Sequence, residues 1–252
     1  MHRAMKLEYS QRKHEAENHF AAVVGSGNGP AGQAPPFFQL FNTWRTTTNK
    51  STREFILDAG LGEIAAAVLD VPAVRLFQDS TFIKAQGCSP TSWHSDLRMT
   101  PLNTNEFVTF WIPLCPVPDQ ESGGTGLSYA SKSHTDFAAA FWYEIDMVDL
   151  SERYEVEDNG DYSLGDVSIH HGWCLHSSPS NEQEETRYAL SLSYCADGAP
   201  LLPRDDRGEF SIDSCGLARI PDCEDKPSWS EWLTEAGDFL ETDQCPVVYK
   251  SD

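Results

Sequence analysis

The feature that most constrains the fold is a series of four short runs rich in β-branched and aromatic residues. Turn-forming Pro, Gly and Asn residues separate them, and their length and composition are typical of β-strands. Ahead of them, residues 51–70 carry apolar side chains at helical spacing, with Gly60 and Gly62 as expected breaks. Helices followed by spaced strands predict a mainly β fold, an antiparallel sandwich or barrel with flanking helices. The four runs are VRLFQDSTFIKA (74–85), FVTFWIPL (107–114), DVSIHHGWCLH (166–176) and RYALSLSYC (187–195).

The remaining segments suggest one domain with polar additions. Residues 1–36 are expected to form a polar helix and a Gly/Pro-rich linker, and residues 37–252 a single domain. An acidic insert, read as a solvated loop or lid, is expected at about residues 135–165, where acids greatly outnumber basic residues. The chain ends in an acidic extension from residue 197, with a short amphipathic helix expected at KPSWSEWL.

The net charge narrows the range of partners. It is −21 at pH 7, and no Lys/Arg cluster interrupts the negative surface. Such a surface repels nucleic acid and anionic membranes, so neither is an expected partner. It suits a neutral or cationic small molecule, although solubility in a salty milieu explains the same charge.

The cysteines and the hydropathy indicate a cytoplasmic protein. Seven widely spread cysteines form no Cys-x-x-Cys pair, which argues against a zinc site or a disulfide framework, and they are expected to be reduced and mostly buried. The sequence has neither a run of 18 apolar residues nor an apolar N-terminal segment, so membrane insertion and secretion are not expected.

Two His-x-Asp pairs are candidate metal sites, at His94 and at His134. With eight histidines and 39 acidic residues, chance alone gives about one such pair, so context must decide. A strand over residues 92–98 would place His94, Asp96 and Arg98 on one face, with Arg98 toward the cavity mouth as a candidate for a substrate carboxylate. The second pair reads as a loop entering a helix, with Asp136 as a helix cap.

A 2-His-1-carboxylate site needs one more histidine, distant in sequence. In the run 166–176, strand alternation places His170 and His176 on a polar face suited to a cavity. The same alternation places His171 on the apolar face, as a packed core histidine. His170 and His176 therefore remain as candidates.

The next strand favours His176. Its Tyr and Leu residues form one apolar face, while Arg187 heads a face of small and polar residues. An arginine on a cavity wall is costly unless it meets an anion, and a carboxylate is its natural partner. With a turn between the two strands, His176 and Arg187 lie near the same end, so one small ligand could reach both a metal and the guanidinium. That is the geometry 2-oxoglutarate requires.

Taken in order, these segments resemble the phytanoyl-CoA dioxygenase family of Fe(II)- and 2-oxoglutarate-dependent oxygenases. The resemblance covers roughly residues 37–196 and includes TSWHSD, the SKSH element at His134, GDVSIHHGWCLHSSPSN and RYALSLSY. It implies a double-stranded β-helix, a jelly-roll barrel with the site at its open mouth. Ser95 and KAQG stand where the family usually has Gln and Lys-Pro-Pro-Gly, and the N-terminus looks short for the family.

The resemblance also implies roles for individual residues. His94, Asp96 and His176 would ligate Fe(II), and Arg187 would pair with the distal carboxylate of 2-oxoglutarate. Three further co-substrate positions follow from it, and they are Ser178, Lys84 and Trp111.

The reaction implied is hydroxylation, or another oxidation, of a small organic molecule with O₂, releasing succinate and CO₂. Because Asp96 is present, hydroxylation is expected over halogenation. The alternatives are a catalytically silent barrel that binds a small molecule as a sensor, and a cupin-like enzyme without 2-oxoglutarate, which Arg187 disfavours.

The net charge of the chain argues for a neutral or amine-bearing substrate and against an acyl-CoA. The sequence does not indicate an oligomeric state.

Overall fold

The computed structural model describes residues 38–47, 49–136, 149–204, 233 and 238–251. The helix and linker expected within residues 1–36 lie outside this part of the chain, as does the helix expected at KPSWSEWL apart from Leu233. A helix following Asp136 would also fall outside it. Within the described part, no helix is both long and apolar enough to cross a membrane.

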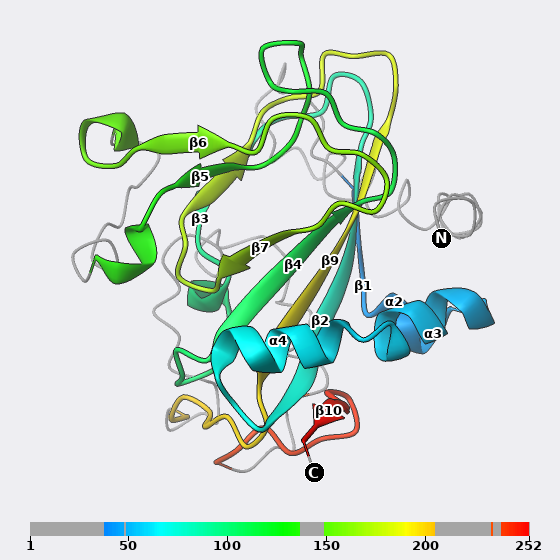
Figure 1. Cartoon of the computed structure of the whole chain (residues 1–252), viewed down its shortest axis with the longest axis vertical. Coiled ribbons are helices and arrows are strands. Elements are labelled where there is room, and N and C mark those ends of the chain that lie inside the picture. The colour runs from blue at the N-terminus through cyan, green and yellow to red at the C-terminus, as the bar shows by residue number, and fades with distance from the viewer. Residues whose placement is uncertain (1–37, 48, 137–148, 205–232, 234–237, 252) are drawn as a thin grey trace.

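Among the described residues, two antiparallel sheets are flanked by three α-helices, which confirms the predicted mainly β fold (Figure 1). The larger sheet has the order β1-β2-β9-β4-β7, with β10 also paired to β2, and the smaller has the order β3-β8-β5-β6. The larger sheet contains β1 (Phe38–Phe41), β2 (Ala73–Lys84), β4 (Phe107–Pro113), β7 (Ser168–His171), β9 (Arg187–Ala196) and β10 (Val247–Lys250). The smaller contains β3 (Thr91–His94), β5 (Ser128–Ala130), β6 (Val156–Asp158) and β8 (His176–Ser178). The helices are α2 (Thr43–Thr46), α3 (Lys50–Asp58) and α4 (Leu61–Leu69), and the 3-10 turns are η1 (Leu97–Met99), η2 (Ser133–Thr135) and η5 (Leu150–Glu152).

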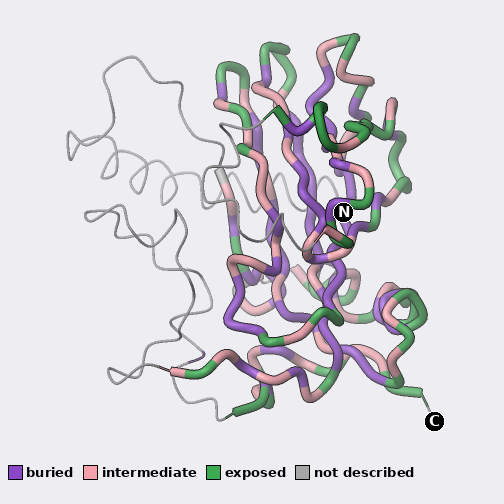
Figure 2. The backbone as a smooth tube through the Cα atoms, turned by 90° about the vertical axis from the view of Figure 1, so that its left-hand side faces the viewer, coloured by how far each residue is buried: buried purple, intermediate pink, exposed green. Residues whose placement is uncertain are grey.

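The alternation of β9 explains how the layers assemble. Its apolar face packs in the main core with side chains of β2, β4, α3 and α4, and α4 lies across the larger sheet in Figure 1. Its other face, headed by Arg187, points toward the smaller sheet, where Arg187 reaches Ser178 of β8. Figure 2 shows the buried residues running along the strands through the middle of the molecule. The site therefore lies between the two sheets, as in a jelly-roll barrel.

The helical segment breaks as predicted at Gly60 but not at Gly62. Gly60 precedes α4 with a positive φ of 77°, which glycine adopts without steric cost. Gly62 lies inside α4, where an added Cβ would come within 3.0 Å of the Val248 side chain. Gly62 therefore allows the close approach of α4 and β10.

The run 166–176 was predicted as one strand but forms two. The chain leaves the larger sheet after β7, where the Gly172 N–H donates to the Phe107 oxygen and the Gly172 oxygen accepts from the Leu97 N–H, before β8 enters the smaller sheet. The apolar face expected on this run is only partly in the core: Leu175 is buried and Val167 packs against the main core, but β7 itself is an edge strand. Ile169 is 42% exposed and His171 is half-buried, so the prediction of a core histidine at 171 is wrong.

The strand expected over residues 92–98 ends at His94. Asp96 takes helical backbone angles, φ −63° and ψ −43°, and η1 begins directly after it. Asp96 therefore lies in a turn and not in a strand. The alternation that placed Arg98 beside His94 does not hold, and Arg98 lies half-buried on η1.

The described part of the acidic insert is more ordered than a loop. β6 pairs with β5, and Tyr162 is buried and exchanges backbone hydrogen bonds with Val117. The five described cysteines are all free, and all but the half-buried Cys115 are buried, as expected. Cys215 and Cys223 lie outside the described residues.

Candidate metal centre and anion site

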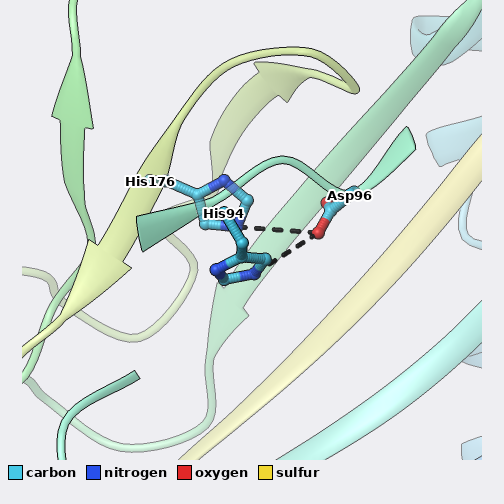
Figure 3. Close-up of side chains that lie close together, drawn as sticks. All are labelled: His94, Asp96 and His176. Atoms are coloured by element: carbon cyan, nitrogen blue, oxygen red, sulfur yellow. Dashed lines mark ion pairs between the residues drawn. The ribbon is translucent and has the colours of Figure 1, made fainter. Parts of the chain in front are cut away.

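His94, Asp96 and His176 meet between the sheets, and one ligand atom from each lies within 4.8 Å of the others (Figure 3). The pairing of β3 with β8 sets His94 opposite His176, and their ring centroids are 4.2 Å apart. Asp96 Oδ1 lies 3.7 Å from His94 Nε2 and 3.6 Å from His176 Nε2. Two imidazoles and one carboxylate converging in this way could hold a divalent metal.

Backbone carbonyls set the tautomers of both rings. His94 Nδ1 lies 2.8 Å from the Ser92 oxygen, and His176 Nδ1 lies 3.0 Å from the Cys174 oxygen. Because a carbonyl oxygen only accepts hydrogen bonds, each Nδ1 carries the hydrogen and each Nε2 turns a lone pair toward Asp96. This is the arrangement that orients metal-binding histidines in proteins.

The protonation states also suit a metal. Burial, helped by the neighbouring His170, lowers the pKa of His176 to about 4, so the ring is neutral at pH 7. Burial opposes ionisation of Asp96, but His176, His170 and His94 together hold its pKa below the usual value. The triad therefore offers a carboxylate and a neutral imidazole at neutral pH.

Lys84 and Arg187 form a second polar centre on the larger sheet. They face each other across β2 and β9, and they are only 1% and 7% exposed. Lys84 Nζ donates to Ser178 Oγ at 3.0 Å and to the Pro179 oxygen at 2.6 Å. Burial and then Arg187 lower the pKa of Lys84 to about 7, and burial lowers that of Arg187 to about 10.

The contacts of Arg187 leave one of its nitrogens unused. Nη2 donates to Ser178 Oγ and to the Thr125 oxygen, and Nε to Thr125 Oγ1, each at 3.2 Å. Nη1 is buried without a hydrogen-bond partner, and no described carboxylate forms a salt bridge with the guanidinium. Two buried cations and an orphaned donor fit an anionic ligand, because an unpaired buried charge is costly.

Trp111 borders this anion site. Its ring centroid lies 5.4 Å from the Arg187 guanidinium carbon and 5.0 Å from the ring of Tyr162. Trp111 is 3% exposed. It closes the apolar side of the anion site, where a guanidinium stacked on an aromatic face is stabilised.

Every residue proposed from the sequence, apart from Arg98, belongs to one of the two centres, but several of their partners were not foreseen. Thr125 sits in the loop GGTG, where no periodicity marks it. Thr109, whose hydroxyl donates to Asp96 Oδ2 at 2.6 Å, is a lone polar residue in an apolar strand, which is a usable signal. His134 lies away from the triad, and its ring packs 5.2 Å from that of His171.

Comparisons with known proteins agree with this geometry. The profile of the family described as phytanoyl-CoA dioxygenase matches residues 37–189. The carbocyclase SnoK from nogalamycin biosynthesis, described as non-heme and alpha-ketoglutarate dependent, is 18% identical with a TM-score of 0.63, over 94% of this chain and 86% of its own. The epimerase SnoN, solved with Fe³⁺, alpha-ketoglutarate and nogalamycin RO, is 18% identical with a TM-score of 0.62, over 96% and 89%. EctD from S. alaskensis, solved with 2-oxoglutarate and 5-hydroxyectoine, is 18% identical with a TM-score of 0.55, over 69% and 65%. Comparison with curated protein sequences finds no match.

Proposed function

This chain belongs to the phytanoyl-CoA dioxygenase family, and from that premise we propose that it hydroxylates a free small molecule with Fe(II), 2-oxoglutarate and O₂, releasing succinate and CO₂. The observation that carries the proposal is a triad of two imidazoles and a carboxylate beside buried Lys84 and Arg187, of which Arg187 has a buried nitrogen without a hydrogen-bond partner.

His94, Asp96 and His176 would hold the iron. Their donor set, two imidazoles and one carboxylate, is the one associated with non-heme Fe(II) oxygenases. The carbonyl oxygens of Ser92 and Cys174 keep the two rings aimed at Asp96 before any metal binds. The protein thus supplies a site ordered in advance.

Arg187 would bind the distal carboxylate of 2-oxoglutarate, with Lys84 as a second cation and Ser178 and Thr125 as polar partners. Ser178 follows His176 by two residues on β8, so the two side chains share a face about 6.6 Å apart along the strand. That spacing suits a five-carbon dicarboxylate that reaches from the metal to the guanidinium. Trp111 would exclude water from the same end.

When bound, the iron supplies the oxidising chemistry through which 2-oxoglutarate loses CO₂ and a substrate C–H bond becomes C–OH. The residues of this chain bind and orient both substrates and keep water out. Small side chains on the inner face of β9 leave room for the co-substrate, and they are Ala189, Ser191 and Ser193.

The substrate is proposed to be neutral or amine-bearing and not an acyl-CoA. The chain carries −21 overall, whereas an acyl-CoA carries several phosphate charges and needs a basic patch. Both buried cations near the triad, Lys84 and Arg187, are assigned to 2-oxoglutarate. The solved SnoN and EctD hold nogalamycin RO and 5-hydroxyectoine, which are small molecules.

The test is succinate formation by the purified protein with Fe(II), 2-oxoglutarate and O₂. Slow succinate release without a prime substrate is expected, with stimulation by some free amines or alcohols. Stimulation by acyl-CoAs alone would contradict the substrate class. No binding of 2-oxoglutarate would contradict the function itself.

A further inference from the structure

Three histidines surround Asp96, and His170 differs from the other two. His170 lies on β7, is 6% exposed, and places its Nε2 3.2 Å from Asp96 Oδ2. Its ring centroid is 4.4 Å from that of His176. Among the described residues, however, it does not join the group of ligand atoms that could share one metal.

The two oxygens of Asp96 have different surroundings. Oδ1 faces the Nε2 atoms of His94 and His176, at 3.7 and 3.6 Å. Oδ2 faces His170 Nε2 and accepts from the Thr109 hydroxyl at 2.6 Å. Thr109 Oγ1 in turn lies 3.1 Å from Ser193 Oγ on β9. One oxygen is therefore directed to the metal position and the other to the larger sheet.

The tautomer of His170 follows from this contact. An ionised carboxylate only accepts hydrogen bonds, so His170 Nε2 must carry a hydrogen to bond Asp96. No carbonyl holds Nδ1, which is buried without a partner among the described residues. The nitrogen of His170 that faces the centre is thus a donor, whereas those of His94 and His176 are lone pairs.

From this difference, and resting on the proposed function, we propose that His170 is a positioning residue which, together with Thr109, keeps Asp96 bound to iron through Oδ1 alone. Chelation by both oxygens would take up a further coordination position and leave fewer for 2-oxoglutarate and O₂. Two donors on Oδ2 oppose that second bond and fix the rotation of the carboxylate. Hydrogen-bonding partners of metal ligands commonly contribute 10- to 100-fold to metal affinity.

The test is Co(II) binding by the full-length protein without O₂, followed by titration and by the visible ligand-field spectrum, whose intensity reports the coordination number. His170→Phe keeps an aromatic ring against Tyr129 and His176 but removes the donor. It should weaken Co(II) binding by about 10- to 100-fold and change the spectrum. His170→Gln, which restores an N–H near the position of Nε2, should recover most of both.

His171→Phe is the matched control. It is the adjacent histidine, half-buried, with its ring against His134 and its Nδ1 accepting from the Trp173 backbone. Its Co(II) affinity and spectrum should match those of the unmodified protein. Thermal melting of each variant separates a folding defect from an effect on the metal.

Two results would overturn the inference: an unchanged affinity and spectrum in His170→Phe, or a loss of binding as complete as in His176→Ala, which would make His170 a ligand. Failure of the proposed function looks different. In that case the unmodified protein would bind no Co(II), or would bind Co(II) but no 2-oxoglutarate.

Discussion

The metal centre and the anion site face the same space but are built in opposite ways. At the metal centre, the His94 and Asp96 side chains are 27% and 20% exposed, opposite charges meet, and backbone carbonyls orient the rings. At the anion site, two cations are almost fully buried side by side and share neutral acceptors. The metal centre therefore has its opposite charges in place, whereas no carboxylate of the described residues pairs with the Arg187 guanidinium.

Loss of a metal ligand should have the largest effect on activity and little on folding. Changing His94, Asp96 or His176 to Ala should each abolish iron-dependent succinate formation, because three protein ligands are the minimum of this centre. The melting temperature should stay close to that of the unmodified protein, since the sheets do not need metal to pair. Activity assays and thermal melts check this, and retained activity in His176→Ala with loss in His170→Ala would exchange their roles.

Loss of the guanidinium should affect co-substrate binding and leave the metal in place. Arg187→Ala removes one partner of a buried charge pair, which typically costs about 3 to 5 kcal/mol, or two to four orders of magnitude in 2-oxoglutarate affinity. Arg187→Lys should not fully restore it, because an ammonium lacks the planar fork. Calorimetric titration with 2-oxoglutarate measures the effect. An unchanged affinity would move the anchor elsewhere, with Lys84 next in line.

The burial of Lys84 should make the stability of the ligand-free protein depend on pH. The folded pKa of Lys84, about 7, lies below the ordinary 10.5, so between these values the unfolded chain holds a proton that the folded chain has lost. The ligand-free protein therefore gains stability as pH rises from 7, by at most about 1.4 kcal/mol per pH unit from this group.

Comparison with Lys84→Met isolates this contribution. Acidic groups elsewhere act equally on both proteins. The unfolding free energy of the unmodified protein should therefore rise relative to that of Lys84→Met as pH rises from 7 toward 10. Denaturant melts at four or five pH values measure it. A difference that stays constant with pH would mean that Lys84 keeps one protonation state in the folded protein over this range.

The smallest effect is expected at the other His-x-Asp pair. His134 is exposed, and its described ring contact is to His171 rather than to the triad. His134→Ala should leave Co(II) affinity unchanged within error. A loss of affinity comparable to that of His94→Ala would show that the two pairs had been assigned the wrong way round.

The sequence predicted the parts of this site that depend on strand periodicity. The sequence of β9 alternates between apolar and small or polar residues, which predicts Arg187 on the face opposite the apolar core, where the structure has it. Asp96 does lie beside His94 and His176, but the strand that was expected to present it is replaced by a turn.

The remaining parts depend on tertiary contacts that leave no periodic signal. The choice between His170 and His176 rests on which ring nitrogen a carbonyl binds, and the anion site needs Thr125 from a glycine-rich loop. The break at Gly172 reflects close packing against Phe107, where an added Cβ would lie 2.7 Å from the ring. Single-strand patterns cannot show such contacts.

The central claim is that the metal centre and the anion site bind one molecule together, and binding of 2-oxoglutarate with and without metal tests it most directly. Calorimetry without O₂ should show that Co(II) tightens 2-oxoglutarate binding strongly, but not that of glutarate, which lacks the 2-oxo group that reaches the metal. In Arg187→Ala both ligands should bind weakly, while the metal still favours 2-oxoglutarate. If Co(II) leaves the affinity for 2-oxoglutarate unchanged in the unmodified protein, the two centres do not share a ligand and the claim is wrong.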